Sequence, residues 1–160
     1  MAAKKTAKKA PSRKPSKKAK AAPTKARAGA ETLKMGSASP GFTVNDLEKS
    51  LVWYRDIVGF VVEERWEQEG KLTGVSLRAG NATFMIGQDD WKKGRDRKKG
   101  EGFRIYCTTA QDVDALAEKI KARGGTLDQE PRDQPWGMRD FALTDPDGFK
   151  ITIAREAKKR

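Results

Sequence analysis

Residues 135–151 read PWGMRDFALTDPDGFKI. This order predicts an aromatic loop, a strand at 139–144, a tight turn and a last strand at 149–154. The turn follows from the run DPDG at 145–148, because Asp side chains accept hydrogen bonds from nearby backbone and glycine tolerates a positive φ. The two aspartates of this run therefore indicate turn chemistry rather than catalysis.

The same plan appears earlier in the chain. A helix is expected from a cap at Asn45, which forms a capping box with Glu48, to Gly59. A second helix of matching length is expected from Asp112 to Gly125. Strands are expected at 42–44, 60–66, 74–78 and 82–87 around the first helix, and at 103–108, 126–130, 139–144 and 149–154 around the second. This internal repeat predicts an α+β fold of two βαβββ modules.

Positive charge is concentrated at the N-terminus. Residues 1–30 carry eleven Lys or Arg and no acid, which leaves 23 basic and 22 acidic residues in 31–160. The early segment has too few apolar residues to offset its conformational entropy. We therefore expect a disordered Lys/Ala/Pro-rich tail at 1–35 and a folded domain at 36–156.

The composition of the tail resembles the tails of linker histones and of basic bacterial nucleoid proteins. That resemblance implies nonspecific binding of nucleic acid or another polyanion through residues 4–27, driven by counterion release. Two alternatives stay open. The tail is a solvated segment with no dedicated partner, or the protein begins at Met35.

Cysteine and histidine usage limits the chemistry. The single cysteine, Cys107, excludes an intramolecular disulfide and fits a reducing compartment. No apolar run approaches the ~20 residues of a membrane span, and no signal peptide is visible. We expect a cytoplasmic protein with no membrane contact, with nucleoid association if the tail binds DNA. The chain has no histidine, the commonest base for activating a nucleophile, and no catalytic residue stands out.

Four motifs together resemble a known family. The runs NDLEKS at 45–50 and WYRDIVGF at 53–60 resemble the first module of the vicinal oxygen chelate superfamily, which includes glyoxalase I, extradiol dioxygenases and bleomycin-resistance proteins. The run DVDAL at 112–116 and the stretch 135–148 resemble its second module. The resemblance spans 37–155 and implies two modules whose curled sheets form a cup around a ligand. It also implies that such cups are commonly completed across a homodimer.

In metal-binding members of that superfamily, the ligands come from the first and last strand of each module. The resemblance places Ser39, Met85, Phe103 or Arg104, and Thr152 at these positions. A divalent metal site of this kind needs imidazole or carboxylate ligands, which none of these residues supplies. We therefore expect neither a metal nor another cofactor.

The expected function is metal-free binding of a small organic molecule, as in the bleomycin-resistance branch, by sequestration. The candidate ligand-binding residues are Met85, Trp91, Phe103, Arg104, Tyr106, Trp136 and Arg139. Simpler roles compete for several of them. Met85 and Phe103 also suit ordinary sheet packing, Arg139 also suits a surface pair with Asp140, and Trp91 either docks over the cup or contacts a partner subunit.

Two other functions remain open. One is an enzyme of the same superfamily, a glyoxalase-like lyase or a dioxygenase. The other is a nucleic-acid-associated protein in which the tail binds and the domain dimerises or senses a ligand. The basic run 92–99 either extends the anion-binding surface of the tail or is a solvated loop.

Overall fold

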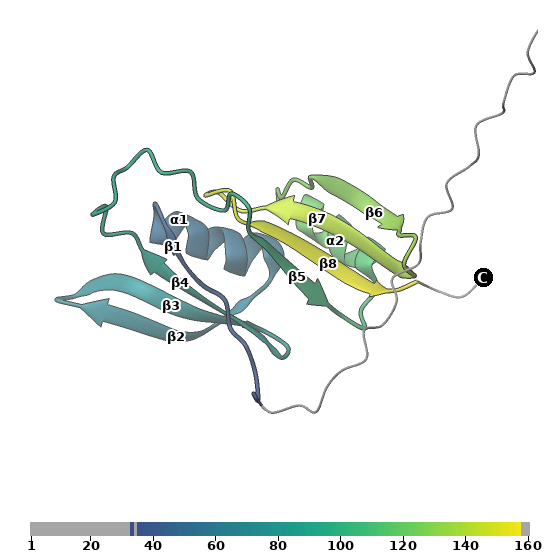
Figure 1. Cartoon of the computed structure of the whole chain (residues 1–160), viewed down its shortest axis with the longest axis horizontal. Helices are drawn as coiled ribbons and strands as arrows, with labels where there is room; N and C mark the ends of the chain where they lie inside the picture. The colour runs from purple at the N-terminus through teal and green to yellow at the C-terminus, as the bar shows by residue number, and fades with distance from the viewer. Residues whose placement is uncertain (1–32, 34, 158–160) are drawn as a thin grey trace, which may run out of the picture. The chain divides into compact units, whose positions relative to one another are not determined.

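The computed structural model describes Leu33 and residues 35–157 (Figure 1). The predicted tail, 1–35, lies outside the described residues apart from Leu33 and Met35. Among the helices that are described, none is long and apolar enough to cross a membrane.

The described chain forms two βαβββ modules, as predicted. The first consists of β1 (Gly41–Val44), α1 (Leu47–Val52), the π-helical turn η1 (Trp53–Val58), β2 (Val61–Gln68), β3 (Lys71–Ala79) and β4 (Ala82–Gln88). The second consists of β5 (Arg104–Thr108), α2 (Val113–Ala122), β6 (Gln129–Asp133), β7 (Met138–Thr144) and β8 (Lys150–Glu156). The strand orders are β1-β4-β3-β2 and β5-β8-β7-β6, so the two sheets have the same topology. No ladder joins the sheets within the described range.

The predicted cap of the first helix was wrong by one residue. Asp46, not Asn45, is the N-cap, and its Oδ1 accepts a hydrogen bond from the Lys49 amide at 3.0 Å. The Asn45 amide instead donates to Asp147 Oδ1 at 3.0 Å, a contact across 102 residues that local spacing does not reveal. The predicted cap at Asp112 is confirmed.

The strand predicted at 126–130 lies further along the chain, at Gln129–Asp133. Its pairing with β7 shifts register between Gln129 and Arg132. Pro131 falls inside this irregular stretch. Because β6 is an edge strand, a proline without an N–H donor is tolerated there.

Both modules contribute to one hydrophobic core beneath the sheets. Its largest fully buried side chains are Tyr54, Phe84, Phe141 and Leu51. The Phe42 ring of β1 lies 4.4 Å from the Phe149 ring before β8, measured between centroids. Figure 1 shows both helices behind the strands, which leaves the other side of each sheet open.

The β7–β8 turn connects the two modules through its aspartates. Asp145 Oδ1 accepts from the backbone amides of Asp147 and Phe149, which is the turn chemistry predicted from the sequence. Its Oδ2 accepts from the Tyr54 hydroxyl of η1 at 3.0 Å. Burial raises the pKa of the Tyr54 hydroxyl and also the pKa of the Asp145 carboxyl. The phenol therefore stays a donor at neutral pH.

Removing the Tyr54 hydroxyl tests this connection. Tyr54→Phe should lower the free energy of unfolding by about 1.5–3 kcal/mol, because a buried carboxylate loses a donor. Urea denaturation measures the loss. Tyr106→Phe is the matched control, since Tyr106 is 47% exposed and its hydroxyl has no partner in the described chain. Equal losses in the two variants would contradict a structural role for the hydrogen bond.

Candidate ligand-binding site

Met85 lies on the open face of the first sheet. Its neighbours in the ladder are Gly41 on β1 and Ser76 on β3. The adjacent residues Phe84 and Ile86 are buried in the core, so the alternation of β4 directs Met85 away from the helix. Met85 is exposed, and only a glycine stands beside it on β1.

Trp66 covers the outer part of this face, and the sequence analysis missed it. Trp66 on β2 pairs with Gly74 on β3, and a Cβ placed on Gly74 would lie 2.6 Å from the Trp66 ring. The indole N–H donates to Glu64 Oε2 at 3.3 Å. A glycine within a strand that otherwise alternates was the available signal, because it marks a close approach by another group.

The carboxylate of Glu63 is bound by two side chains of the same sheet. It pairs with the Arg78 guanidinium at 3.2 Å and accepts a hydrogen bond from the Ser76 hydroxyl at 3.4 Å. The register shift between Val62 and Glu64 gives Glu63 this position.

On the second sheet, Tyr106 and Thr152 are neighbours in the parallel β5–β8 ladder. Tyr106 is exposed, whereas Thr152 is only 4% exposed. The buried Thr152 hydroxyl has no hydrogen-bond partner within the described residues. In the same ladder Arg104 lies beside Lys150, and Phe103 precedes the strand. Of the two residues that the sequence left as alternatives, only Arg104 is therefore part of β5.

A cleft of about 890 Å³ lies between the modules. We call it the intermodule cleft. It is bounded by β5, the β3–β4 turn, the end of η1 and α2, and the residues that line it include Phe60, Phe84, Tyr106, Cys107, Leu116 and Arg123. Cys107 is half-buried, and burial raises the pKa of its thiol. The neutral thiol is a poor nucleophile.

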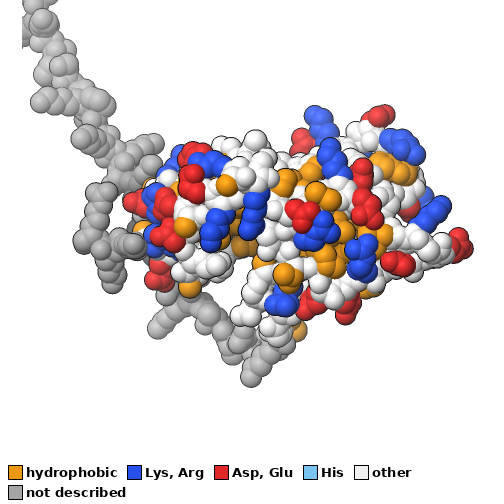
Figure 2. Space-filling view, turned by 180° about the vertical axis from the view of Figure 1, so that it is seen from behind, with side chains coloured by type: hydrophobic (Ala, Val, Ile, Leu, Met, Phe, Trp, Pro, Cys, Tyr) orange, Lys and Arg blue, Asp and Glu red, His pale blue; other side chains and the backbone are white. Residues whose placement is uncertain are grey.

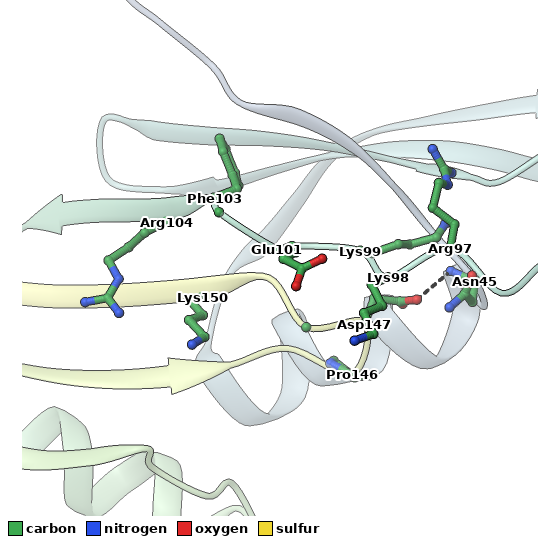
Figure 3. A pocket seen from close by; sticks show the side chains of 13 residues that line it. Asn45, Arg97, Lys98, Lys99, Glu101, Phe103, Arg104, Pro146, Asp147 and Lys150 are labelled. Carbon is green, nitrogen blue, oxygen red and sulfur yellow. Dashed lines mark hydrogen bonds between the residues drawn. The ribbon is translucent and has the colours of Figure 1, made fainter. Parts of the chain in front are cut away.

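A second cavity, of about 670 Å³, contains Phe103 and Arg104 (Figure 3). It lies between residues 97–104, in the segment that links the modules, and the turn at 146–150. We call it the linker crevice.

Asp89 fixes the linking segment. Its buried carboxylate pairs with both Arg97 and Lys99, and it accepts from the Trp91 amide at 3.0 Å. Lys99 also donates to the Thr43 carbonyl at 3.2 Å, so the loop is attached to β1. The hydrogen bond from Lys99, followed by that from the Trp91 amide, lowers the pKa of Asp89 well below its usual range.

The structure does not bring the other predicted residues to either cavity. The Trp91 ring packs within its own loop, 4.5 Å from the Arg95 guanidinium carbon. Trp136 is exposed on the β6–β7 turn.

Arg139 lies against α2. It donates to Asp114 at 2.8 Å and to Asp133 at 3.1 Å, and these bonds raise its pKa. The expected pair with Asp140 is wrong, because Asp140 faces the other way along β7 and accepts from the side-chain amides of Gln129 and Gln134.

The side chains do not suit a metal. The four positions named from the resemblance carry Ser39, Met85, Thr152 and either Phe103 or Arg104, of which Arg104 lies on β5 and Phe103 precedes it. Hydroxyl and thioether groups are poor ligands for a hard or borderline divalent ion. In residues 33 and 35–157, no three carboxylate or thiolate side chains gather to form a metal-binding group.

Comparisons with known proteins agree on one family. The model of the Glyoxalase/Bleomycin resistance protein/Dioxygenase superfamily matches residues 36–153. A probable lactoylglutathione lyase of Synechocystis sp. is 30% identical over 124 residues, which cover 73% of this chain and 92% of that protein. A probable chloroplastic lactoylglutathione lyase of Arabidopsis thaliana is 28% identical over 117 residues, 70% of this chain but only 33% of the longer plant protein. The glutathione transferase FosA of Serratia marcescens is 22% identical over 111 residues, 69% of this chain and 73% of that protein.

Solved structures share the fold. TioX from Micromonospora sp. ML1 superposes with a TM-score of 0.62 at 21% identity, covering 76% of this chain and 99% of its own. A glyoxalase/bleomycin resistance protein/dioxygenase from Nocardioides gives a TM-score of 0.62 at 15% identity, covering 81% and 89%. At such identities the likeness concerns the fold alone.

Low pH should break the ion pairs that Asp89 forms with Arg97 and Lys99. The pKa of Asp89 is lower in the folded than in the unfolded protein, so its ion pairs stabilise the fold above about pH 4 and are lost as pH falls through the folded pKa. The Tm of Asp89→Asn should lie below that of the wild type at about pH 6, and the gap should narrow as pH falls below about 4, because the pKa of Asp89 is lower in the folded protein.

Asp96→Asn is the control, because Asp96 is exposed and has no ion pair in the described chain. A Tm difference between the wild type and Asp89→Asn that stayed constant with pH would show that the charge of Asp89 does not stabilise the fold.

Proposed function

Because the chain belongs to the glyoxalase/bleomycin resistance protein/dioxygenase superfamily, we propose that it binds a small organic molecule on the open faces of its sheets without a metal ion. The mechanism is sequestration: the bound molecule is removed from solution and no bond is broken. This places the protein beside the bleomycin-resistance members in mode of action. Its ligand is a planar or aromatic molecule.

One observation carries the proposal. At the four positions where the resemblance places the metal ligands of the superfamily, this chain has Ser39, Met85, Phe103 or Arg104, and Thr152. None of these side chains is a carboxylate or an imidazole, so the usual metal ligand is missing at every position and not only at one.

The same faces suit an organic ligand. Trp66, Met85 and Tyr106 are large apolar side chains that are exposed on their strands. Aromatic rings and a flexible thioether bind planar molecules by stacking and close packing. The unpaired Thr152 hydroxyl supports this use, because a buried hydroxyl without a partner is costly and a polar ligand group would satisfy it.

We further propose that the binding unit is a homodimer. The two sheets of one chain are not joined by a ladder within the described residues, and each leaves exposed apolar side chains on its open face. A second copy that brings the first sheet of one protomer to the second sheet of its partner would enclose the ligand. The binding of nucleic acid by residues 4–27 remains a separate prediction for the tail.

A second function is a glyoxalase-like lyase. The names of the relatives from Synechocystis and Arabidopsis favour it. It would need acid–base groups on the open faces, where Glu63 is engaged by Arg78 and Tyr106 is the exposed hydroxyl.

Metal content separates the two functions. Protein purified without added metal should contain less than about 0.1 ion per chain, and zinc, nickel, manganese or magnesium should leave its Tm unchanged, because an ion that binds the native state raises Tm by mass action. Elemental analysis and thermal shift measure both. Near-stoichiometric metal with a raised Tm would overturn metal-free binding and move the lyase to first place.

A panel of aromatic compounds should yield ligands that raise Tm. Met85→Ala and Tyr106→Ala should each weaken binding about tenfold, which corresponds to about 1.4 kcal/mol. Trp136→Ala, on the β6–β7 turn and not on a strand of either open face, should have no effect. Sedimentation velocity on the same samples should show dimers. An effect of Trp136→Ala as large as that of Tyr106→Ala would place the ligand elsewhere.

A further inference from the structure

We propose that the linker crevice binds the phosphate backbone of single-stranded nucleic acid, so that the folded domain contacts nucleic acid independently of the tail. The contacting cations are Lys98, Arg104 and Lys150, which line the crevice together with Phe103 (Figure 3).

Charge is segregated within the folded domain. Residues 89–104 together with Lys150 carry eight basic and four acidic side chains, whereas the remainder of 35–157 carries eleven basic and seventeen acidic ones. On the face seen in Figure 2, acidic and basic side chains are interspersed. An otherwise acidic domain therefore has one basic segment, and a local positive potential of this kind attracts polyanions.

Three of the basic side chains that line the crevice are free to bind an anion. Arg97 and Lys99 pair with Asp89, but Lys98, Arg104 and Lys150 have no ion-pair partner in the described part of the chain. Arg104 and Lys150 are also direct neighbours in the β5–β8 ladder. Like charges at paired positions of a sheet repel each other, and an anion bound between them removes that cost.

The walls of the crevice are held in place by backbone contact. Gly100 (φ +69°) approaches Gly148 (φ +96°) so closely that a Cβ on Gly100 would overlap the Gly148 carbonyl oxygen. The anchor at Asp89 holds the same loop from its other end. The cations therefore project from a fixed frame, which reduces the entropy lost on binding.

Phe103 offers an exposed aromatic ring on which a nucleobase can stack. The ring is 44% exposed and meets Phe149 edge-on, with the planes at 88° and the centroids 6.2 Å apart. An edge-on contact leaves much of the Phe103 ring free for stacking. A basic groove beside an exposed aromatic ring is the usual arrangement for binding single strands without sequence preference.

Of the two acidic residues that line the crevice, Glu101 is the one without a hydrogen-bond or ion-pair partner in the described chain. Its side chain lies between Arg104 and Lys150 on one side and Lys98 on the other (Figure 3). The other acid, Asp147, already accepts hydrogen bonds from Asn45 and Ser50. Glu101 therefore opposes an approaching phosphate, and its removal should strengthen binding.

Several features favour a polymer over a single phosphate. The crevice is continuous in sequence with the basic run 92–99, so cations extend beyond one phosphate-sized position. A nucleic-acid backbone presents repeated charges that engage such cations together, with release of counterions.

The test compares two triple variants of the full chain. The crevice variant is Lys98→Ala, Arg104→Ala and Lys150→Ala. The control is Lys49→Ala, Lys71→Ala and Arg132→Ala, three exposed cations outside the crevice that have no ion pair among the described residues. Both variants keep the tail and have the same net charge, so a difference between them reports the crevice.

Fluorescence anisotropy with a labelled oligothymidylate gives the affinity at several salt concentrations. The crevice variant should bind about tenfold more weakly than the control at about 0.1 M salt, with a log–log salt slope lower by about 2. Glu101→Gln should bind more tightly than the wild type. Equal affinities and slopes in the two triple variants would overturn the proposal.

Inorganic phosphate distinguishes a small anion from a polymer. If phosphate raises the Tm of the wild type but not of the crevice variant, while both triples bind the oligonucleotide equally, the crevice takes a small phosphate and the nucleic-acid proposal is wrong. Metal-free ligand binding on the sheets is judged separately, because the residues tested for it, Met85 and Tyr106, are unchanged in the crevice variant.

Discussion

The hydrogen bond from Tyr54 to Asp145 determines how the two modules fit together. A carboxylate buried at the β7–β8 turn needs donors, and it receives two from its own turn and one from the first module. The neighbouring Asp147 accepts from the Asn45 amide and the Ser50 hydroxyl of the first module. A turn of one module is therefore part of the helix start of the other, so the orientation of the two sheets depends on it.

That orientation leaves one face of each sheet open. The fold supplies strand positions, and the side chains at those positions decide the chemistry. In this chain the open faces carry hydroxyl, thioether and aromatic groups, and the carboxylates of Glu63 and Asp140 are bound by an arginine and by amide side chains. The scaffold of the superfamily is retained, and these side chains favour binding by shape and apolar contact over binding of a divalent ion.

The segment between the modules has a second role in the structure. Asp89 neutralises two of its cations and Lys99 donates a hydrogen bond to β1, so the remaining positive charge is presented from a fixed loop. The Gly100–Gly148 contact brings this loop to the same turn that holds the modules together. The linker crevice and the module interface thus share the residues around 146–148.

The sequence by itself determined the repeat, both helices and nearly all strands, because apolar periodicity and glycine or aspartate turns act between near neighbours in the chain. It also showed that the chain has no histidine, since this depends on residue identity alone, whereas the loss of the superfamily's metal site stays a prediction. Only the tertiary structure decided which groups meet across long separations. Asp46 rather than Asn45 is the cap, the Asn45 amide donates to Asp147 of the other module, and Arg139 pairs with Asp114 on α2 rather than with Asp140. Trp66 over Gly74 and the pairing of Arg104 with Lys150 depend on strand register, which is fixed by bulges and by packing against the shared core rather than by local preference.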